Sequence, residues 1–236
     1  MKRARRRWRL LWLGTSATLL LTPSPAAAAA ARTITISGTS AAHPLVADLT
    51  FFYRRDAAHP ARFAIVGGGT ATAIADAARG VVDAGLTDRP PGAGDPAGLR
   101  YTPLARSALC IVTNPANPVP SISAHQVQGI ALAGTDAARG VFTATVARTF
   151  SAPGQVRDHV LATPAGWGFV DLGFTAGLHV VAYEGMPCSA DAPYPGRREL
   201  GFVTRGAPRG ELARFLRWVA RDATARRVIA TRYVIP

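Results

Sequence analysis

The chain has 236 residues, of which 27 are basic and 14 acidic, and 48% are hydrophobic. This length is enough for one large domain or two small lobes. Apart from the basic run at the N-terminus, the arginines are scattered and are not interleaved with aromatic side chains, which argues against a nucleic-acid-binding protein and favours a solvated basic surface.

Residues 1–31 have the pattern of an export signal. Lys2 and five arginines form a basic head, an apolar run follows, and an alanine-rich stretch offers a cleavage site. The apolar run of about twelve residues is too short for a transmembrane helix, which needs roughly twenty. We therefore expect an exported protein, periplasmic or in the cell envelope and soluble after cleavage, with a net charge of +7 left in residues 32–236.

The next segment predicts a β-α-β-α-β unit. Strands are expected at residues 33–37, 62–66 and 82–86, and helices at residues 44–53 and 70–79. Such a unit forms a parallel sheet with right-handed crossovers. Ligands of open α/β sheets gather beyond the carboxyl ends of the strands, so the residues after each strand are the first candidates for a site.

Polar or glycine-rich residues follow all three strands. They are Thr39 and Ser40, then the glycine turn that includes Gly69 and Thr70, then Thr87 and Asp88. A glycine turn that opens a helix presents unpaired backbone N–H groups, which bind anions. An ionised carboxylate can only accept a proton, so Asp88 would favour an anion that still carries one.

Each of these features also has a simpler interpretation. Thr39 and Ser40 are typical helix-capping residues, a run of glycines is a flexible turn, and Asp88 is a natural salt-bridge partner for the adjacent Arg89. The prediction of a site rests on the fold bringing all three strand ends together.

The remaining elements are less regular. We expect a strand at residues 107–113, a proline-bounded crossing between lobes at residues 114–118, and a short helix capped near residues 121–123. Further along, the sequence predicts a helical stretch at residues 141–150, strands at residues 166–170, 178–183 and 199–204, and helices at residues 211–221 and 223–232, the last capped by Asp222.

The cysteines and histidines do not predict a metal site or a catalytic site. Cys110 and Cys188 are the only cysteines, and in an exported chain a disulfide and a buried free thiol are both plausible. The five histidines are dispersed, and no spacing suggests a metal site or a catalytic dyad. His43 is the one histidine expected beside the predicted site, next to Ser40. We expect neither metal, cofactor nor enzymatic activity.

An ordered series of segments resembles the phosphate-binding proteins that feed ABC transporters. Residues 38–45 resemble their G-S-T-x-x-x-P-L block, and residues 69–74 and 80–90 resemble G-S-G-x-G-I and G-x-A-D-I-G-x-A-S-D-R-P. Residues 112–119, 164–170 and 194–198 resemble V-N-P-x-N-P-V, N-P-G-A-I-G-Y-V and Y-P-L-x-R. The series covers nearly all of residues 32–236.

The resemblance implies a periplasmic-binding-protein-like α/β fold with mixed, mostly parallel sheets, a hinge and a cleft between two lobes. Residues 32–112 and 190–236 would form lobe 1, and residues 113–189 a shortened lobe 2. The hinge would lie near residues 114–118 and the return strand near residues 187–199.

The resemblance also implies roles for individual residues. The first-loop hydroxyl would be Thr39 or Ser40, the glycine-loop hydroxyl Thr70, and the proton acceptor Asp88, with Thr87 beside it. In the second lobe these families carry an arginine and an S-G-T turn. The matching place, residues 134–142, has lost the serine and threonine, and Arg139 stands in the serine position, so Arg139 and Gly140 are expected to complete the site.

The expected function is capture of a small protonated oxyanion, most simply phosphate, by a monomer that delivers it to an ABC transporter permease. The alternative is a relic of a binding lobe that acts as an envelope interaction or sensory module without phosphate transport.

Overall fold

The computed structural model describes residues 32–56, 61–127, 150, 152–191 and 193–236. All of these belong to one compact unit, residues 31–236. The predicted export signal, Arg139, Gly140 and nearly all of the helical stretch predicted at residues 141–150 lie outside the described residues.

The predicted β-α-β-α-β unit is confirmed. It consists of β1 (Thr33–Gly38), α1 (His43–Asp56), β2 (Arg62–Gly67), α2 (Gly69–Arg79) and β3 (Ala84–Thr87). Strand β1 lies between β2 and β3 and is parallel to both, with Gly38 opposite Gly67 on one side and Leu86 on the other. The three strands therefore end at the same edge of the sheet.

Close backbone contacts hold this edge together. A Cβ atom on Gly38 would lie 2.0 Å from the carbonyl oxygen of Leu86, and one on Gly85 would lie 2.4 Å from the carbonyl oxygen of Ala73. No side chain fits at such separations. Glycine at these positions lets β3 approach β1 on one side and α2 on the other.

Strand β4 (Leu99–Thr113) is longer than the strand predicted at residues 107–113. Its first part pairs with β8 (Arg197–Arg205) as far as Ala108. From Leu109 it pairs with β6 (Trp167–Asp171) and β7 (His179–Tyr183). The chain thus passes inside a continuous strand from the first half of the sheet, which contains β1, β2, β3 and β8, to the second half, which contains β6 and β7.

The crossing between lobes predicted at residues 114–118 stays a prediction, and the change of strand partners lies before it, within β4. The side-chain amide of Asn114 donates to the carbonyl oxygens of Val160 and Leu161, both at 3.0 Å. Pro115 and Pro118 follow the end of β4 at Thr113.

Among the described residues the strands form one eight-stranded sheet in the order β2-β1-β3-β8-β4-β7-β5, with β6 also paired to β4. Strand β5 (Ser121–Ile122) is parallel to β7, while all pairs made by β4 and β8 are antiparallel. The sheet is mixed as expected, but its parallel pairs are limited to β1 with β2, β1 with β3, and β5 with β7. Helix α4 (Pro153–Ala162), which packs on β6, was not predicted.

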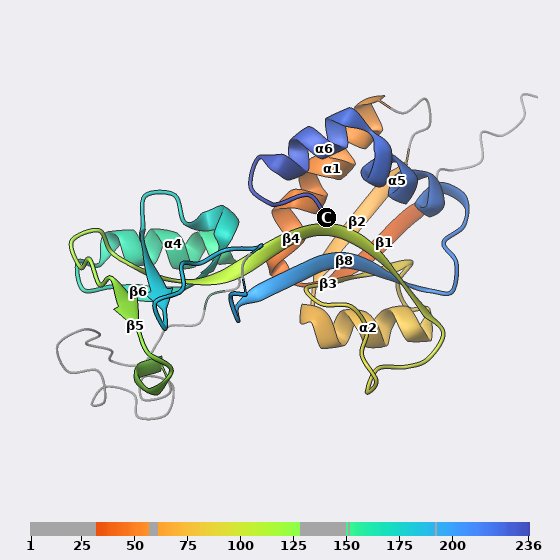
Figure 1. The fold of residues 1–236 in the computed structure, drawn as a ribbon. Coiled ribbons are helices and arrows are strands. Elements are labelled where there is room, and N and C mark those ends of the chain that lie inside the picture. Colours follow the sequence, from red (N-terminus) through yellow and green to blue (C-terminus); the bar gives the residue numbers. More distant parts are fainter. Residues whose placement is uncertain (1–31, 57–60, 128–149, 151, 192) are drawn as a thin grey trace, which may run out of the picture. The chain divides into compact units, whose positions relative to one another are not determined.

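Helices cover both faces of the first half of the sheet (Figure 1). Helices α1, α5 (Gly210–Arg221) and α6 (Ala223–Ala230) pack against one another over one face, and α2 packs on the other. The core between the sheet and the three helices is largely aliphatic and contains a group of aromatic side chains, in which the rings of Phe63 and Phe215 are 4.9 Å apart. Asp222 caps α6 as predicted, since its carboxylate accepts the backbone N–H of Thr224 at 2.7 Å.

The two cysteines form a disulfide between Cys110 and Cys188. The bond ties β4 to the segment before β8, within a cluster of buried residues that includes Val170 and Tyr194. Of the two alternatives left open by the sequence, the structure has the disulfide.

Candidate functional site

The three predicted loops meet at the carboxyl edge of β1, β2 and β3. The backbone N–H of Thr39 donates to the carbonyl oxygen of Leu86 at 2.9 Å, and that of Gly68 donates to the carbonyl oxygen of Gly38 at 3.1 Å. These bonds tie the loop after β1 to the ends of its two neighbours. The expectation that the strand ends come together is fulfilled.

Thr70 and Asp88 are in direct contact. The Thr70 hydroxyl donates to Oδ1 of Asp88 at 2.5 Å, and the backbone N–H of Asp88 donates back to the same hydroxyl at 3.1 Å. The two bonds fix the carboxylate of Asp88 against the first turn of α2. Its second oxygen, Oδ2, faces another partner described below.

The glycine turn shapes the start of α2. Gly69 has φ of +72°, a conformation that side chains rarely adopt, and Gly68 before it offers no side-chain cap to the helix. The first N–H groups of a helix have no intrahelical acceptor. Together with the partial positive charge of the helix N-terminus, they favour an anion at this place.

The other predicted residues differ in how they are placed. Thr39 is buried, and Ser40 is half-buried in a 3-10 turn (Ser40–Ala42). The hydroxyl of Thr87 is buried and donates to the carbonyl oxygen of Gly201 at 3.3 Å, so it supports the pairing of β3 with β8. The Thr87 side chain is therefore turned to β8, and of these two residues Asp88 is the one that reaches the site.

The simpler interpretation of Asp88, a salt bridge with Arg89, is wrong. Arg89 binds Asp95, with Nη1 and Oδ2 2.6 Å apart, and this pairing holds the pKa of the Asp95 carboxyl at about 2. Asp88 instead faces Arg198, whose Nη1 lies 3.3 Å from Oδ2 of Asp88.

Arg198 lies between two carboxylates. Its Nη1 is also 3.8 Å from Oδ1 of Asp171, the last residue of β6. The Asp171 side chain is only 4% exposed. Burial raises its pKa to about 6, against the opposing effect of Arg198 and with a smaller contribution from the negative charge of Asp88. The site therefore combines a partly exposed acid, Asp88, with an arginine, Arg198, and a buried acid, Asp171.

His43, at the first position of α1, also lies beside the glycine turn. A Cβ atom on Gly67 would lie 3.8 Å from Cε1 of His43. Its Nε2 is buried and has no hydrogen-bond partner among the described residues. The ring thus packs under the turn and leaves a polar atom unused by the part of the chain that the structure describes.

The sequence did not single out Arg198 or Asp171 as site residues. Arg198 was visible only as the last residue of the segment resembling Y-P-L-x-R. The structure explains that segment: the Tyr194 hydroxyl donates to the carbonyl oxygen of Leu109 at 3.0 Å, and the N–H of Leu109 donates to Gly196 at 2.8 Å. The segment is held against β4, and this brings Arg198 to Asp88.

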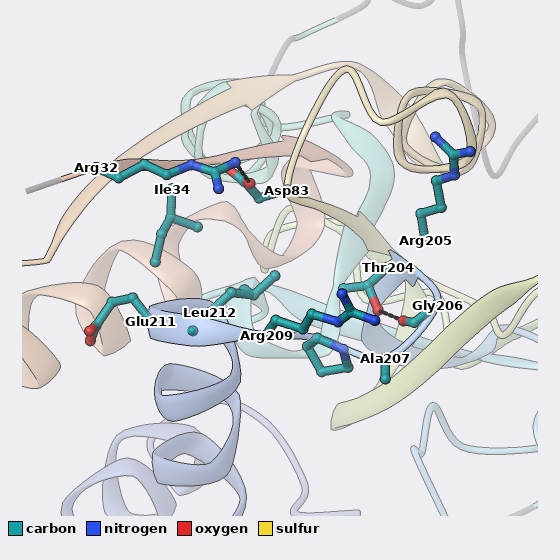
Figure 2. A pocket seen from close by; sticks show the side chains of 12 residues that line it. Arg32, Ile34, Asp83, Thr204, Arg205, Gly206, Ala207, Arg209, Glu211 and Leu212 are labelled. Atoms are coloured by element: carbon teal, nitrogen blue, oxygen red, sulfur yellow. Dashed lines mark hydrogen bonds and ion pairs between the residues drawn. The ribbon is translucent and has the colours of Figure 1, made fainter.

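A second concave region lies at the opposite edge of the sheet, beyond Thr204 and the start of β1. It is a cavity of about 600 Å³ lined by Arg32, Arg205 and Arg209 (Figure 2). Arg32 is paired with Asp83 at 2.6 Å, and Arg205 extends toward Gly80 at the end of α2. Thr87, which precedes Asp88, pairs with Gly201 in the middle of β8, whereas the cavity is lined from Thr204 onward at the end of that strand, so the cavity is separate from the Asp88 site.

The described residues contain neither a candidate metal site nor a candidate membrane span. Within them, no three His, Cys, Asp or Glu side chains are grouped so that they could hold a metal ion. The same residues contain no helix of the length and apolar character that a membrane span requires.

Comparison with solved structures identifies the fold. A phosphate ABC transporter substrate-binding protein from Clostridium perfringens, solved with bound phosphate, is 16% identical with a TM-score of 0.71, over 86% of this chain and 99% of that chain. An ABC-type phosphate transport receptor from Vibrio cholerae is 19% identical with a TM-score of 0.65, over 87% and 100%. The OxyR regulatory domain of Pseudomonas aeruginosa is 14% identical with a TM-score of 0.53, over 79% and 94%.

These structural similarities establish the expected two-lobed, periplasmic-binding-protein-like α/β fold. A search of curated protein sequences gave no significant match. The family model described as the PBP superfamily domain matches residues 23–143, about half of the chain. The chain is therefore a member of the PBP superfamily.

Proposed function

We propose that the protein is an exported substrate-binding protein that captures a protonated oxyanion, phosphate, for uptake by an ABC transporter. The observation that carries the proposal is the Thr70–Asp88 pair at the N-terminus of α2, where a fixed carboxylate stands beside the first turn of a helix whose N-cap, Gly68, makes no side-chain cap hydrogen bond. Its support in the wider family is the phosphate bound by the structurally similar protein from Clostridium perfringens.

The chemistry distinguishes protonated from unprotonated anions. Helical N–H groups and the hydroxyls of Thr39 and Ser40 would offer hydrogen bonds to any small oxyanion, while the Thr70 hydroxyl donates to Asp88 and fixes its carboxylate. The ionised Asp88 accepts only, so it bonds to an anion that donates a proton and repels one that has none. Phosphate and arsenate carry such a proton near neutral pH, and sulfate does not.

The lobes that we propose follow the sequence prediction, with residues 113–189 facing residues 32–112 and 190–236 and with Arg139 and Gly140 supplying the second half of the site. The change of strand partners at Leu109, close to this boundary, supports the division. Micromolar binding needs about 8 kcal/mol net, and a charge-assisted hydrogen bond contributes about 1.5–3 kcal/mol. Several such bonds are therefore required, since association also costs entropy.

Calorimetry with inorganic phosphate, arsenate and sulfate tests the proposal. We expect heat from phosphate and arsenate, little from sulfate, and loss of the phosphate signal in Asp88→Asn. Asp158→Asn is the matched control, because Asp158 lies on the exposed side of α4 and pairs with Arg157. Absence of phosphate heat from the unaltered protein at millimolar concentration would refute phosphate capture.

A second candidate is a sensory or interaction module that kept the fold without the ligand. The similarity to the OxyR regulatory domain shows that this fold also serves outside solute capture. Such a module would give no heat with any of the three anions while remaining folded by circular dichroism.

A further inference from the structure

The strongest unexplained feature is the arrangement of Asp88, Arg198 and Asp171. The three residues come from three separate strands: Asp88 follows β3, Arg198 is the second residue of β8, and Asp171 ends β6. A single guanidinium group therefore faces acids from both halves of the sheet.

The geometry is not that of a closed salt bridge. Charge-assisted N–H···O bonds are usually about 2.7–2.9 Å long, whereas Nη1 of Arg198 is 3.3 Å from Asp88 and 3.8 Å from Asp171. Oδ1 of Asp171 is buried and accepts no hydrogen bond from the described residues. Arg198 is thus held near both acids while its fork of N–H donors is not committed to either.

The exposure of the three side chains supports the same interpretation. Asp88 and Arg198 are each 25% exposed, so solvent or a ligand reaches them, whereas Asp171 is 4% exposed. Asp171 cannot itself meet a ligand. It can only orient Arg198 and set the charge behind it.

We propose that Arg198 is an anion-binding residue of the Asp88 site, and that Asp171 is the positioning residue that holds the guanidinium toward it. This inference rests on the proposed function and names a cation that the sequence did not place there. Arginine presents planar, paired donors that match two oxygens of a phosphate-like anion.

The charge balance of the group makes binding dependent on pH. With both acids ionised, the three side chains carry a net charge of −1, which opposes an incoming anion. The charged or titratable groups acting on Asp171 are Arg198, Asp88 and, through its interaction with Asp171, Tyr233, whose hydroxyl donates to the carbonyl oxygen of Ala41. Protonation of Asp171 removes one negative charge from the group and so lowers the electrostatic opposition to an incoming anion.

Arg198→Gln, Arg198→Lys and Arg197→Gln provide the first test, using calorimetry with inorganic phosphate. Arg197 is the matched control because it is the neighbouring residue of β8 and is exposed. We expect Arg198→Gln to raise the dissociation constant at least about tenfold, the loss of one charge-assisted bond. Arg198→Lys should give an intermediate value, and Arg197→Gln should be unchanged.

Asp171→Asn provides the second test through a pH profile. Between pH 5 and 7 the affinity of the unaltered protein for phosphate should fall more steeply than that of Asp171→Asn, because only the former gains a buried charge as pH rises. If Asp171 only supported the fold, its replacement would change the affinity by the same factor at every pH, and the two profiles would run parallel. Parallel profiles would overturn the role of Asp171.

The two proposals fail in different ways. If the unaltered protein gives no heat with phosphate, the proposed function fails and the inference with it. If it binds phosphate and Arg198→Gln binds equally well, the function stands and the inference about Arg198 is wrong. Thermal unfolding of each variant identifies loss of folding, and Arg198→Lys then decides the matter because it keeps the charge and the stem.

Discussion

At two positions, Asp171 and Gly38, the surrounding fold determines which side chain can be tolerated. Asp171 is an acid in a place that disfavours its charge, since burial raises its pKa to about 6. Gly38 is the reverse, a position where the absence of a side chain permits the closest contact between β1 and β3. Both positions are defined by the fold around them, and both allow a measurable prediction.

Replacement of Asp171 by Asn should stabilise the protein at neutral pH. A carboxyl whose pKa is higher in the folded than in the unfolded state contributes stability at low pH and loses it as pH rises through the folded value. The window here runs from about pH 4 to pH 6. Urea unfolding should therefore show that Asp171→Asn gains about 2 kcal/mol relative to the unaltered protein between pH 4.5 and pH 7.5. An equal difference at both pH values would contradict the burial argument.

Replacement of Gly38 by Ala should be severely destabilising. The added methyl group would lie 2.0 Å from the carbonyl oxygen of Leu86, so β1 and β3 would have to separate. We expect a loss of at least about 3 kcal/mol in the free energy of unfolding. Gly94→Ala is the control, because nothing lies within 4 Å of a Cβ atom there. Similar unfolding midpoints for the two variants would show that the contact is not limiting.

At the scale of elements, periodic sequence predicted most of the structure and failed where pattern and packing disagree. The β-α-β-α-β unit and helices α5 and α6 have regular apolar spacing, and all were found. The first part of β4 was missed because Pro103 and flanking polar residues break the alternation of apolar and polar residues. In the structure the strand continues past Pro103 with a shift of register against β8 between Pro103 and Ala105. Helix α4 was missed because Val160 is its one buried residue and leaves no apolar stripe.

The same distinction applies to the candidate site. The contact of Thr70 with Asp88 follows from parallel strands ending at one edge, which local sequence indicates. The contact of Arg198 with Asp88 and Asp171 depends on antiparallel pairing of β8 with β3 and β4. No local pattern encodes such a pairing.

Helix α6 offers a direct test of a capping residue. Asp222 accepts the N–H of Thr224 and is the sequence-predicted cap. Asp222→Ala should lower the free energy of unfolding by about 1 kcal/mol. Asp48→Ala, an exposed change within α1, should have little effect. Chemical denaturation of both variants measures the difference, and equal midpoints would argue against the cap.

At the scale of the molecule, the disulfide closes a long segment, since Cys110 and Cys188 are separated by 78 positions in the sequence. Cross-links of such loops stabilise chiefly by restricting the unfolded chain. The double variant Cys110→Ala, Cys188→Ala should therefore lose about 2–4 kcal/mol. Thermal unfolding with and without a reducing agent provides the measurement. Reduction should lower the midpoint of the unaltered protein and leave that of the double variant unchanged.

Strand β4 has one more consequence for how the molecule would respond to its surroundings. Because one uninterrupted strand is shared by both halves of the sheet, no flexible loop in β4 separates them, and any rotation of one half must be distributed as twist along hydrogen-bonded backbone. Deformation of this kind is elastic, with a restoring force that grows with amplitude. A protein built in this way returns to its resting shape once the load is removed.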